Sequence, residues 1–167
     1  TRVLAALGAS VEEDVHTLVF LEKAFAHTGG YDLRIRPYPT RPLDAAQEIA
    51  PLSCRDFYNT STGSLADDLG WADVVLYSST TVGLEAVAAG IPAVHLDLGD
   101  FLDTDPMFGW DDFKWPVREP AELVDTIKSI RAIPDTEFKK RQREGFEYIS
   151  SYLTPVSAAG LQPFLEA

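Results

Sequence analysis

Short apolar runs alternate along this chain with segments whose apolar side chains recur at helical spacing. Residues 74–77 form an uninterrupted apolar run, which is typical of a strand buried on both faces of a parallel sheet. The segment 11–27 instead places its apolar side chains on one face of a helix. Further strands are predicted at 2–7, 31–37, 53–58 (as an edge strand), 91–96 and 113–117, and further helices at 43–50, 64–70, 82–89, 120–133, 135–153 and after Pro155. This alternation predicts an α/β fold: a doubly wound, Rossmann-like parallel sheet of about six strands in three αβα layers.

Residue types favoured at helix ends support several of these boundaries. Ser64 and Asp67 have the spacing of a capping box that carries Asp in place of Glu. Pro120 suits the first position of a helix, and Asp135 suits the N-cap of the next one. Gly90 stands where a helix often ends in a left-handed residue.

The segment 72–96 contains a strand, a hydroxyl-rich turn, a short helix and a second strand. The turn consists of Ser78, Ser79, Thr80 and Thr81. A helix that begins at the carboxyl edge of a parallel sheet directs backbone N–H groups and a positive dipole end into the crevice, where they hold phosphate. Glu85, about one turn further, suits a ribose diol in the same crevice. These residues indicate a nucleoside diphosphate site.

Each of these signals also has a simpler structural explanation. Hydroxyl side chains cap helices in many proteins, and a glutamate on a helix is often solvent-exposed. Four successive hydroxyls favour phosphate binding. The apolar neighbours of Glu85 suggest a largely buried helix. Burial of a charged side chain is unfavourable, so its presence there favours a functional role.

Weaker candidates follow the other predicted strands. Gly8 and Ser10 follow the first strand and face the same crevice, although Ser10 and Glu13 equally suit a capping box. Asn59 follows the possible third strand, in a segment that is better explained as a plain polar loop. Asp97, Gly99 and Asp100 begin an acidic, solvated loop that we expect to contact the ligand. This loop lacks the spacing of a calcium site, and we predict no metal.

The composition narrows the classes of partner. The 167 residues suit a single domain, with 26 acidic and 14 basic side chains and a net charge of −12. The electrostatic field of so acidic a protein repels nucleic acids, so we predict no nucleic-acid partner. With one cysteine and no visible leader or membrane span, a cytoplasmic location is expected.

The segment 65–94, which reads LADDLGWADVVLYSSTTVGLEAVAAGIPAV, resembles the C-terminal donor-binding domain of glycosyltransferases with the GT-B fold. It is also similar to the related non-hydrolysing UDP-N-acetylglucosamine 2-epimerases. A strand followed by prolines at 34–39 resembles a segment of the CDP-glycerol and capsule polysaccharide transferases, with Tyr38 in place of their histidine. The resemblance implies that Ser79, Thr80 and Thr81 hold the donor diphosphate and that Glu85 binds the ribose. It also implies that loop residues such as Asn59 contact the base.

The resemblance thus implies that residues 1–167 are one nucleotide-sugar-binding domain, a fragment whose N-terminal acceptor domain is absent. We expect a nucleotide sugar such as a UDP sugar as the donor, a role in polysaccharide biosynthesis, and no cofactor. The isolated domain is expected to be inactive, since the acceptor site and general base belong to the missing domain. Any peripheral membrane association would come through that domain only.

Two other functions stay open at this point. One is half of a UDP-N-acetylglucosamine 2-epimerase, which would share the same binding residues. The other is a non-catalytic, flavodoxin-like binding module, because a fold alone does not determine function.

Overall fold

The computed structural model describes residues 1–8, 10–99 and 104–153. Six parallel strands form one sheet in the order β3-β2-β1-β4-β5-β6. Their bounds are β1 Arg2–Ala6, β2 Asp32–Arg36, β3 Asn59–Thr60, β4 Val74–Tyr77, β5 Ala93–Leu96 and β6 Lys114–Val117. The predicted doubly wound α/β sheet is confirmed.

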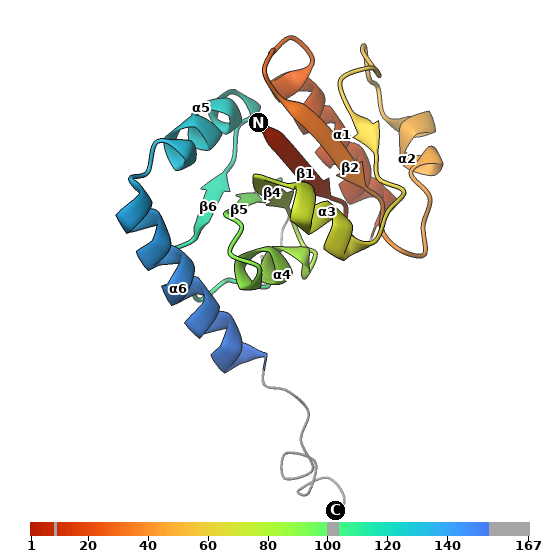
Figure 1. Ribbon diagram of the computed structural model, residues 1–167. Coiled ribbons are helices and arrows are strands. Elements are labelled where there is room, and N and C mark those ends of the chain that lie inside the picture. Colours follow the sequence, from red (N-terminus) through yellow and green to blue (C-terminus); the bar gives the residue numbers. More distant parts are fainter. Residues whose placement is uncertain (9, 100–103, 154–167) are drawn as a thin grey trace, which may run out of the picture.

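Helices cover both faces of the sheet, so the molecule has three layers (Figure 1). One face packs against α1 (Val11–Phe25), α2 (Asp44–Ile49) and α5 (Pro120–Arg131). The other packs against α3 (Leu65–Trp71), α4 (Val82–Ala88) and α6 (Asp135–Tyr152). No helix in the described ranges is long and apolar enough to cross a membrane.

The central strands owe their place to their apolar composition. All four residues of β4 are buried. Val74 and Leu76 belong to the core beneath α1 and α5, whereas Val75 and Tyr77 belong to the core beneath α3, α4 and α6. Successive side chains of a strand point to opposite faces, so an uninterrupted apolar run is what a doubly covered strand requires.

Most helix ends agree with the sequence signals. The Ser64 hydroxyl accepts from the Asp67 N–H, and the Asp67 carboxylate accepts from the Ser64 N–H, which completes the predicted capping box. Gly90 has the expected left-handed conformation, with φ of 74°. Asp135 differs, because it is the first residue of α6 and Pro134 occupies the cap position without a side-chain bond. The expected helix after Pro155 lies outside the described residues.

The predicted third strand at 53–58 was wrong, and β3 is instead a two-residue strand at Asn59–Thr60. Phe57 and Tyr58 both pack against the core, and their ring centroids lie 4.8 Å apart. Adjacent residues of a strand cannot both turn to the same face. This aromatic pair therefore needs an irregular segment, and strand pairing begins only after it.

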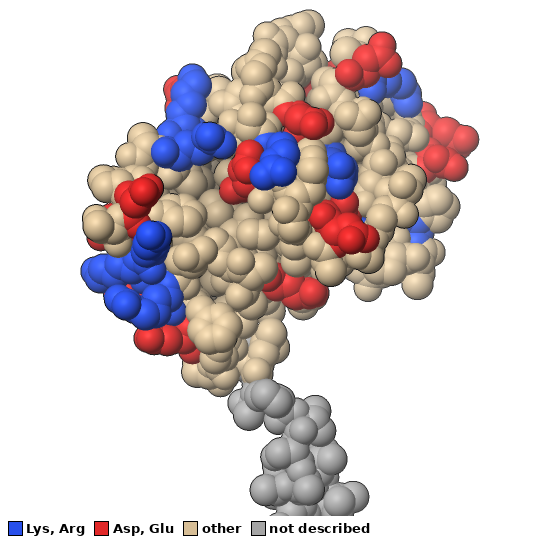
Figure 2. All heavy atoms as spheres, viewed as in Figure 1, with Lys and Arg blue, Asp and Glu red and all other residues tan. Residues whose placement is uncertain are grey.

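Charged side chains are unevenly spread over the surface. Figure 2 shows acidic and basic side chains interspersed over one face, with a group of basic side chains over α6. This helix carries Lys139, Lys140, Arg141 and Arg143. The net charge of −12 therefore does not exclude a locally basic surface at α6.

Candidate functional site

A cleft lies at the carboxyl edge of the sheet, beside the two strands at which the chain changes direction. Strands β1, β2 and β3 run outward to one side and β4, β5 and β6 to the other, so β1 and β4 flank the switch point. Ligands of open α/β sheets bind in the crevice at this point. The cleft has a volume of about 310 Å³ and is lined by Ala6, Leu7, Arg36, Pro37, Tyr38, Pro39, Leu65, Thr80, Thr81, Val82 and Glu85.

The start of α4 supplies the polar side of this cleft. Thr81 is the N-cap residue of α4, but its side chain makes no capping hydrogen bond. Glu85 is solvent-exposed and lines the cleft together with Thr80 and Thr81. Two of the four predicted hydroxyl residues, Thr80 and Thr81, therefore lie in one cleft with the predicted carboxylate. Glu85 is not the buried charge that its apolar neighbours suggested.

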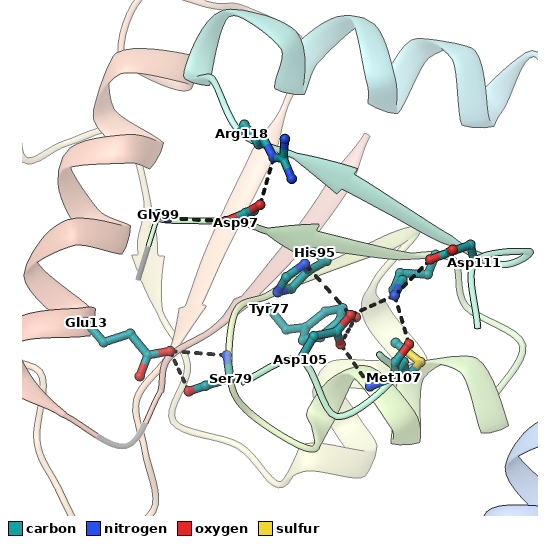
Figure 3. A network of polar contacts seen from close by, with 11 residues as sticks. Glu13, Tyr77, Ser79, His95, Asp97, Gly99, Asp105, Met107, Asp111 and Arg118 are labelled. Carbon is teal, nitrogen blue, oxygen red and sulfur yellow. Dashed lines mark hydrogen bonds and ion pairs between the residues drawn. The ribbon is translucent and has the colours of Figure 1, made fainter. Parts of the chain in front are cut away.

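The first two hydroxyl residues of the turn have different surroundings. Ser78 is buried, with 6% of its surface exposed. The Ser79 backbone N–H and hydroxyl both donate to the Glu13 carboxylate, with N–O and O–O distances of 3.2 and 2.5 Å (Figure 3). The Ser79 amide, which was predicted to bind phosphate, thus binds the carboxylate of Glu13.

Ser10 is the N-cap of α1, and its hydroxyl accepts from the Glu13 N–H at 3.1 Å. The side chain of Glu13 extends to Ser79 across the switch point. The full capping box considered for Ser10 and Glu13 is therefore wrong on its glutamate side. Sequence spacing pointed to the local partner, whereas the neighbouring loop after β4 provides the actual one.

Gly8 makes room for this contact. A Cβ at Gly8 would lie 2.0 Å from a Glu13 carboxylate oxygen, far inside van der Waals contact. The Gly8 carbonyl accepts from Arg41 at 2.8 Å, and the same guanidinium binds the Asp14 carboxylate at 2.7 Å. Burial raises the pKa of Asp14 despite this pairing. Arg41 thus ties the proline-rich loop to the loop after β1.

A buried ion cluster lies behind the cleft. The Asp68 side chain, 1% exposed, accepts from Arg34 at 2.9 Å and from Arg36 at 2.7 Å. Burial alone would raise the pKa of Asp68. The hydrogen bonds from Ser61 and the two arginines outweigh burial and leave the pKa lowered. This cluster fixes α3 against β2 and holds Arg36, a lining residue of the cleft.

The acidic loop begins with a paired carboxylate. Asp97 accepts from the Arg118 side chain at 2.8 Å and from the Gly99 N–H at 3.2 Å. The Arg118 hydrogen bond is the main cause of the lowered pKa of Asp97. Asp100 lies outside the described residues. Asn59 is exposed in β3 and does not line the cleft.

Sequence reasoning missed a buried network beneath α4. Asp105 accepts from the Tyr77 hydroxyl at 2.9 Å and from the Lys114 ammonium at 2.7 Å (Figure 3). The His95 Nδ1 atom lies 3.9 Å from the same carboxylate. Burial opposes ionisation of Asp105, but hydrogen bonds led by that of Lys114 leave its pKa lowered. The sequence carried no signal beyond a lysine inside a predicted strand.

Among the described residues, no group of three or more His, Cys, Asp or Glu side chains has the arrangement of a metal site. The predicted acidic loop is included only in part, since residues 100–103 lie outside the described ranges.

Several solved structures of glycosyltransferases resemble this fold. The spinosyn rhamnosyltransferase SpnG matches with a TM-score of 0.64 and 18% identity, over 99% of this chain and 45% of its own. The wall teichoic acid polymerase TagF matches with a TM-score of 0.59 and 13% identity, over 99% of this chain and 40% of its own. The catalytic domain of the Helicobacter pylori cholesterol-alpha-glucosyltransferase matches with a TM-score of 0.56 and 12% identity, over 91% of this chain and 100% of its own.

The chain has the fold of a GT-B glycosyltransferase domain. It spans less than half the length of SpnG and TagF. No protein-family model and no curated protein matches the chain. At identities below 20%, the likeness is one of fold, and a closer relation to epimerases or to CDP-glycerol transferases stays a prediction.

Proposed function

We propose that this chain is the nucleotide-sugar-binding domain of a glycosyltransferase and that its donor is a nucleoside diphosphate sugar. The observation that carries the proposal is the cleft at the switch point, in which Thr80, Thr81 and Glu85 meet. Hydroxyl and backbone donors at the start of a helix suit phosphate, and a carboxylate about one turn away suits the ribose hydroxyls.

The chemistry of glycosyl transfer fits this arrangement. Negative charge grows on the nucleoside diphosphate as the bond to the sugar breaks. Fixed donors aimed at that charge stabilise the transition state without having to reorganise. In this proposal the 78–81 turn stabilises the charge on the leaving group, and Glu85 positions the nucleoside through its ribose.

Further contacts are assigned from position alone. Gly8 and Ser10 lie on the loop after β1, at the phosphate side. Asp97 and Gly99 lie at the start of the loop after β5, where a donor sugar would extend, and Asp100 is proposed for the same contact from its sequence position. Asn59, which does not line the cleft of the unbound protein, is assigned to the base. The structure of SpnG complexed with thymidine diphosphate supports a nucleoside diphosphate as the ligand of this fold.

The proposal extends to the rest of the enzyme. The acceptor site and the general base would belong to a second, N-terminal domain, so the 167-residue domain alone should not turn over a sugar nucleotide. A cytoplasmic role in polysaccharide biosynthesis, with membrane contact only through that second domain, completes the proposal. No cofactor is assigned.

Titration of the protein with UDP, CDP, GDP and dTDP and their sugars, followed by calorimetry and thermal shift, tests this function. One nucleoside diphosphate should bind and raise the melting temperature, and Glu85→Ala should weaken its binding. Glu147→Ala is the matched control, because Glu147 is an exposed helical glutamate on α6 that does not line the cleft. Failure of all four nucleotides to bind would move the assignment to a non-catalytic module.

A further inference from the structure

We propose that the Glu13 carboxylate occupies the position of a ligand phosphate at Ser79 and that a bound nucleoside diphosphate must displace it. Glu13 would then determine how strongly the cleft discriminates against negative charge. This inference rests on the proposed function, because Ser79 directly precedes Thr80 and Thr81, which line the cleft.

The geometry at Ser79 is that of a bound anion. The carboxylate accepts both the backbone N–H, at 3.2 Å, and the hydroxyl, at 2.5 Å. Hydrogen bonds to a charged acceptor are shorter and stronger than those between neutral groups. A phosphate oxygen would need the same two donors.

This contact joins the two loops of the switch point. Glu13 lies 66 residues from Ser79 in the sequence, and the two are brought together because β1 pairs directly with β4. In Figure 3 the Glu13 side chain extends from the loop side of α1 toward the start of the Ser79 turn. It therefore crosses the crevice in which this fold class places its ligand.

The local chain is built around the carboxylate. Gly8 has no side chain at the place where a Cβ would lie within 2.2 Å of three Glu13 carboxyl atoms. The N-cap of α1 uses the backbone N–H of Glu13 and not its side chain. The carboxylate is thus free of the capping function that its position in the helix would suggest.

Charge decides the consequence for a ligand. Among the described residues, no lysine, arginine or histidine forms an ion pair with Glu13, whereas the adjacent Asp14 is paired with Arg41. A phosphate that approaches Ser79 therefore meets a like charge and must compete for the same donors. The neutral nucleoside part of the ligand meets no such opposition.

The test compares Glu13→Gln with wild type in calorimetric titrations with UDP, CDP, GDP and dTDP and with the four corresponding nucleosides. Glutamine keeps the size and the acceptor oxygen but removes the charge. We expect about tenfold tighter binding of the preferred diphosphate, because a charge-assisted hydrogen bond contributes about that much, and unchanged binding of the nucleoside. Glu12→Gln is the control, since Glu12 is an exposed neighbour whose replacement changes the net charge equally.

The outcomes separate the two proposals. Tighter diphosphate binding in Glu13→Gln but not in Glu12→Gln supports the inference. Equal or weaker diphosphate binding in Glu13→Gln overturns the inference but leaves the proposed function standing. Absence of diphosphate binding in both wild type and Glu13→Gln overturns the two together.

Discussion

Two kinds of acidic side chain lie at or near the carboxyl edge of the sheet. Asp68 and Asp105 are buried, and each is paired with cationic side chains at 2.7–2.9 Å. Glu85 lines the switch-point cleft, and Glu13 is bound to Ser79 in the turn that leads into it. Among the described residues, neither glutamate forms an ion pair. The same residue chemistry thus appears in two environments.

Under the proposed function, this difference separates the acids that stabilise the fold from those that serve a ligand. A buried carboxylate needs a partner, because removal from water costs several kcal/mol per ion. Glu13 is only partly buried and Glu85 is exposed, so neither needs such a partner. The Glu85 carboxylate is available to accept hydrogen bonds from a ribose. The Glu13 carboxylate instead accepts from the Ser79 N–H and hydroxyl, the two donors that a phosphate would need.

Removal of a buried acid should have the largest effect. Asp105→Asn leaves the Lys114 ammonium, whose side chain is 5% exposed, without its buried carboxylate. We expect a loss of about 3–5 kcal/mol in the free energy of unfolding, which is the usual cost of breaking a buried ion pair from one side. Urea denaturation measures it.

Asp111→Asn is the matched control for that experiment. Asp111 also contacts Lys114, at 3.0 Å, but its side chain is 82% exposed. Its replacement should cost at most about 1 kcal/mol. Equal losses for the two variants would contradict the division into buried and exposed acids.

The second largest effect is expected at low pH, where the buried ion pairs should lose their contribution to stability. The pKa values of Asp68 and Asp105 are lowered in the folded protein, so their stabilisation is complete above the unfolded value and is lost as the pH falls through the folded values. Asp14, with its raised pKa, acts in the opposite direction. Thermal unfolding should therefore show a steep loss of stability below about pH 4. A flat profile down to about pH 2.5 would contradict the lowered pKa values.

The cleft acid Glu85 should affect ligand and not fold. Glu85→Gln is expected to change the free energy of unfolding by less than about 0.5 kcal/mol, as is usual for an exposed position. It should weaken binding of the preferred nucleoside diphosphate about tenfold, which corresponds to about 1.4 kcal/mol. Calorimetry and urea denaturation on the same preparations separate the two effects. A large loss of stability would place Glu85 with the buried acids.

The smallest effect is expected at the cap of the helix that carries Asp68. Ser64→Ala removes the two hydrogen bonds of the Ser64 hydroxyl, which accepts from the Asp67 N–H and donates to the Asp67 carboxylate. We expect a loss of about 1 kcal/mol in the free energy of unfolding. Ser64→Asp should retain most of the stability, because aspartate is a good N-cap. Urea denaturation measures both variants. An unaffected Ser64→Ala protein would mean that the ion cluster alone holds α3.

Local signals in the sequence predicted much of the fold. The apolar run at 74–77, the capping box at Ser64 and the left-handed Gly90 each depend on neighbours within a few residues. The third strand was misplaced because Phe57 and Tyr58 pack side by side on the core, which residue types alone do not reveal.

The candidate site was predicted in part, for the same reason. Thr80, Thr81 and Glu85 share one short helix and its turn, so spacing brought them together correctly in the cleft. Glu13 was taken as a local capping residue, because its contact with Ser79 depends on the pairing of β1 with β4. Lys114 looked like an ordinary strand residue, since its partner Asp105 belongs to a loop without periodic pattern.

The central claim is that the cleft between the loops after β1 and β4 binds a nucleoside diphosphate. Amide NMR spectra of ¹⁵N-labelled protein, recorded during titration with the preferred nucleotide, test it most directly. We expect the amide signals of α5 and α6 to stay in place, and the largest shifts to fall at Gly8, Glu13, Ser79, Thr80, Thr81 and Glu85. Shifts that cluster on α5 or α6, with the 78–81 turn unchanged, would contradict it.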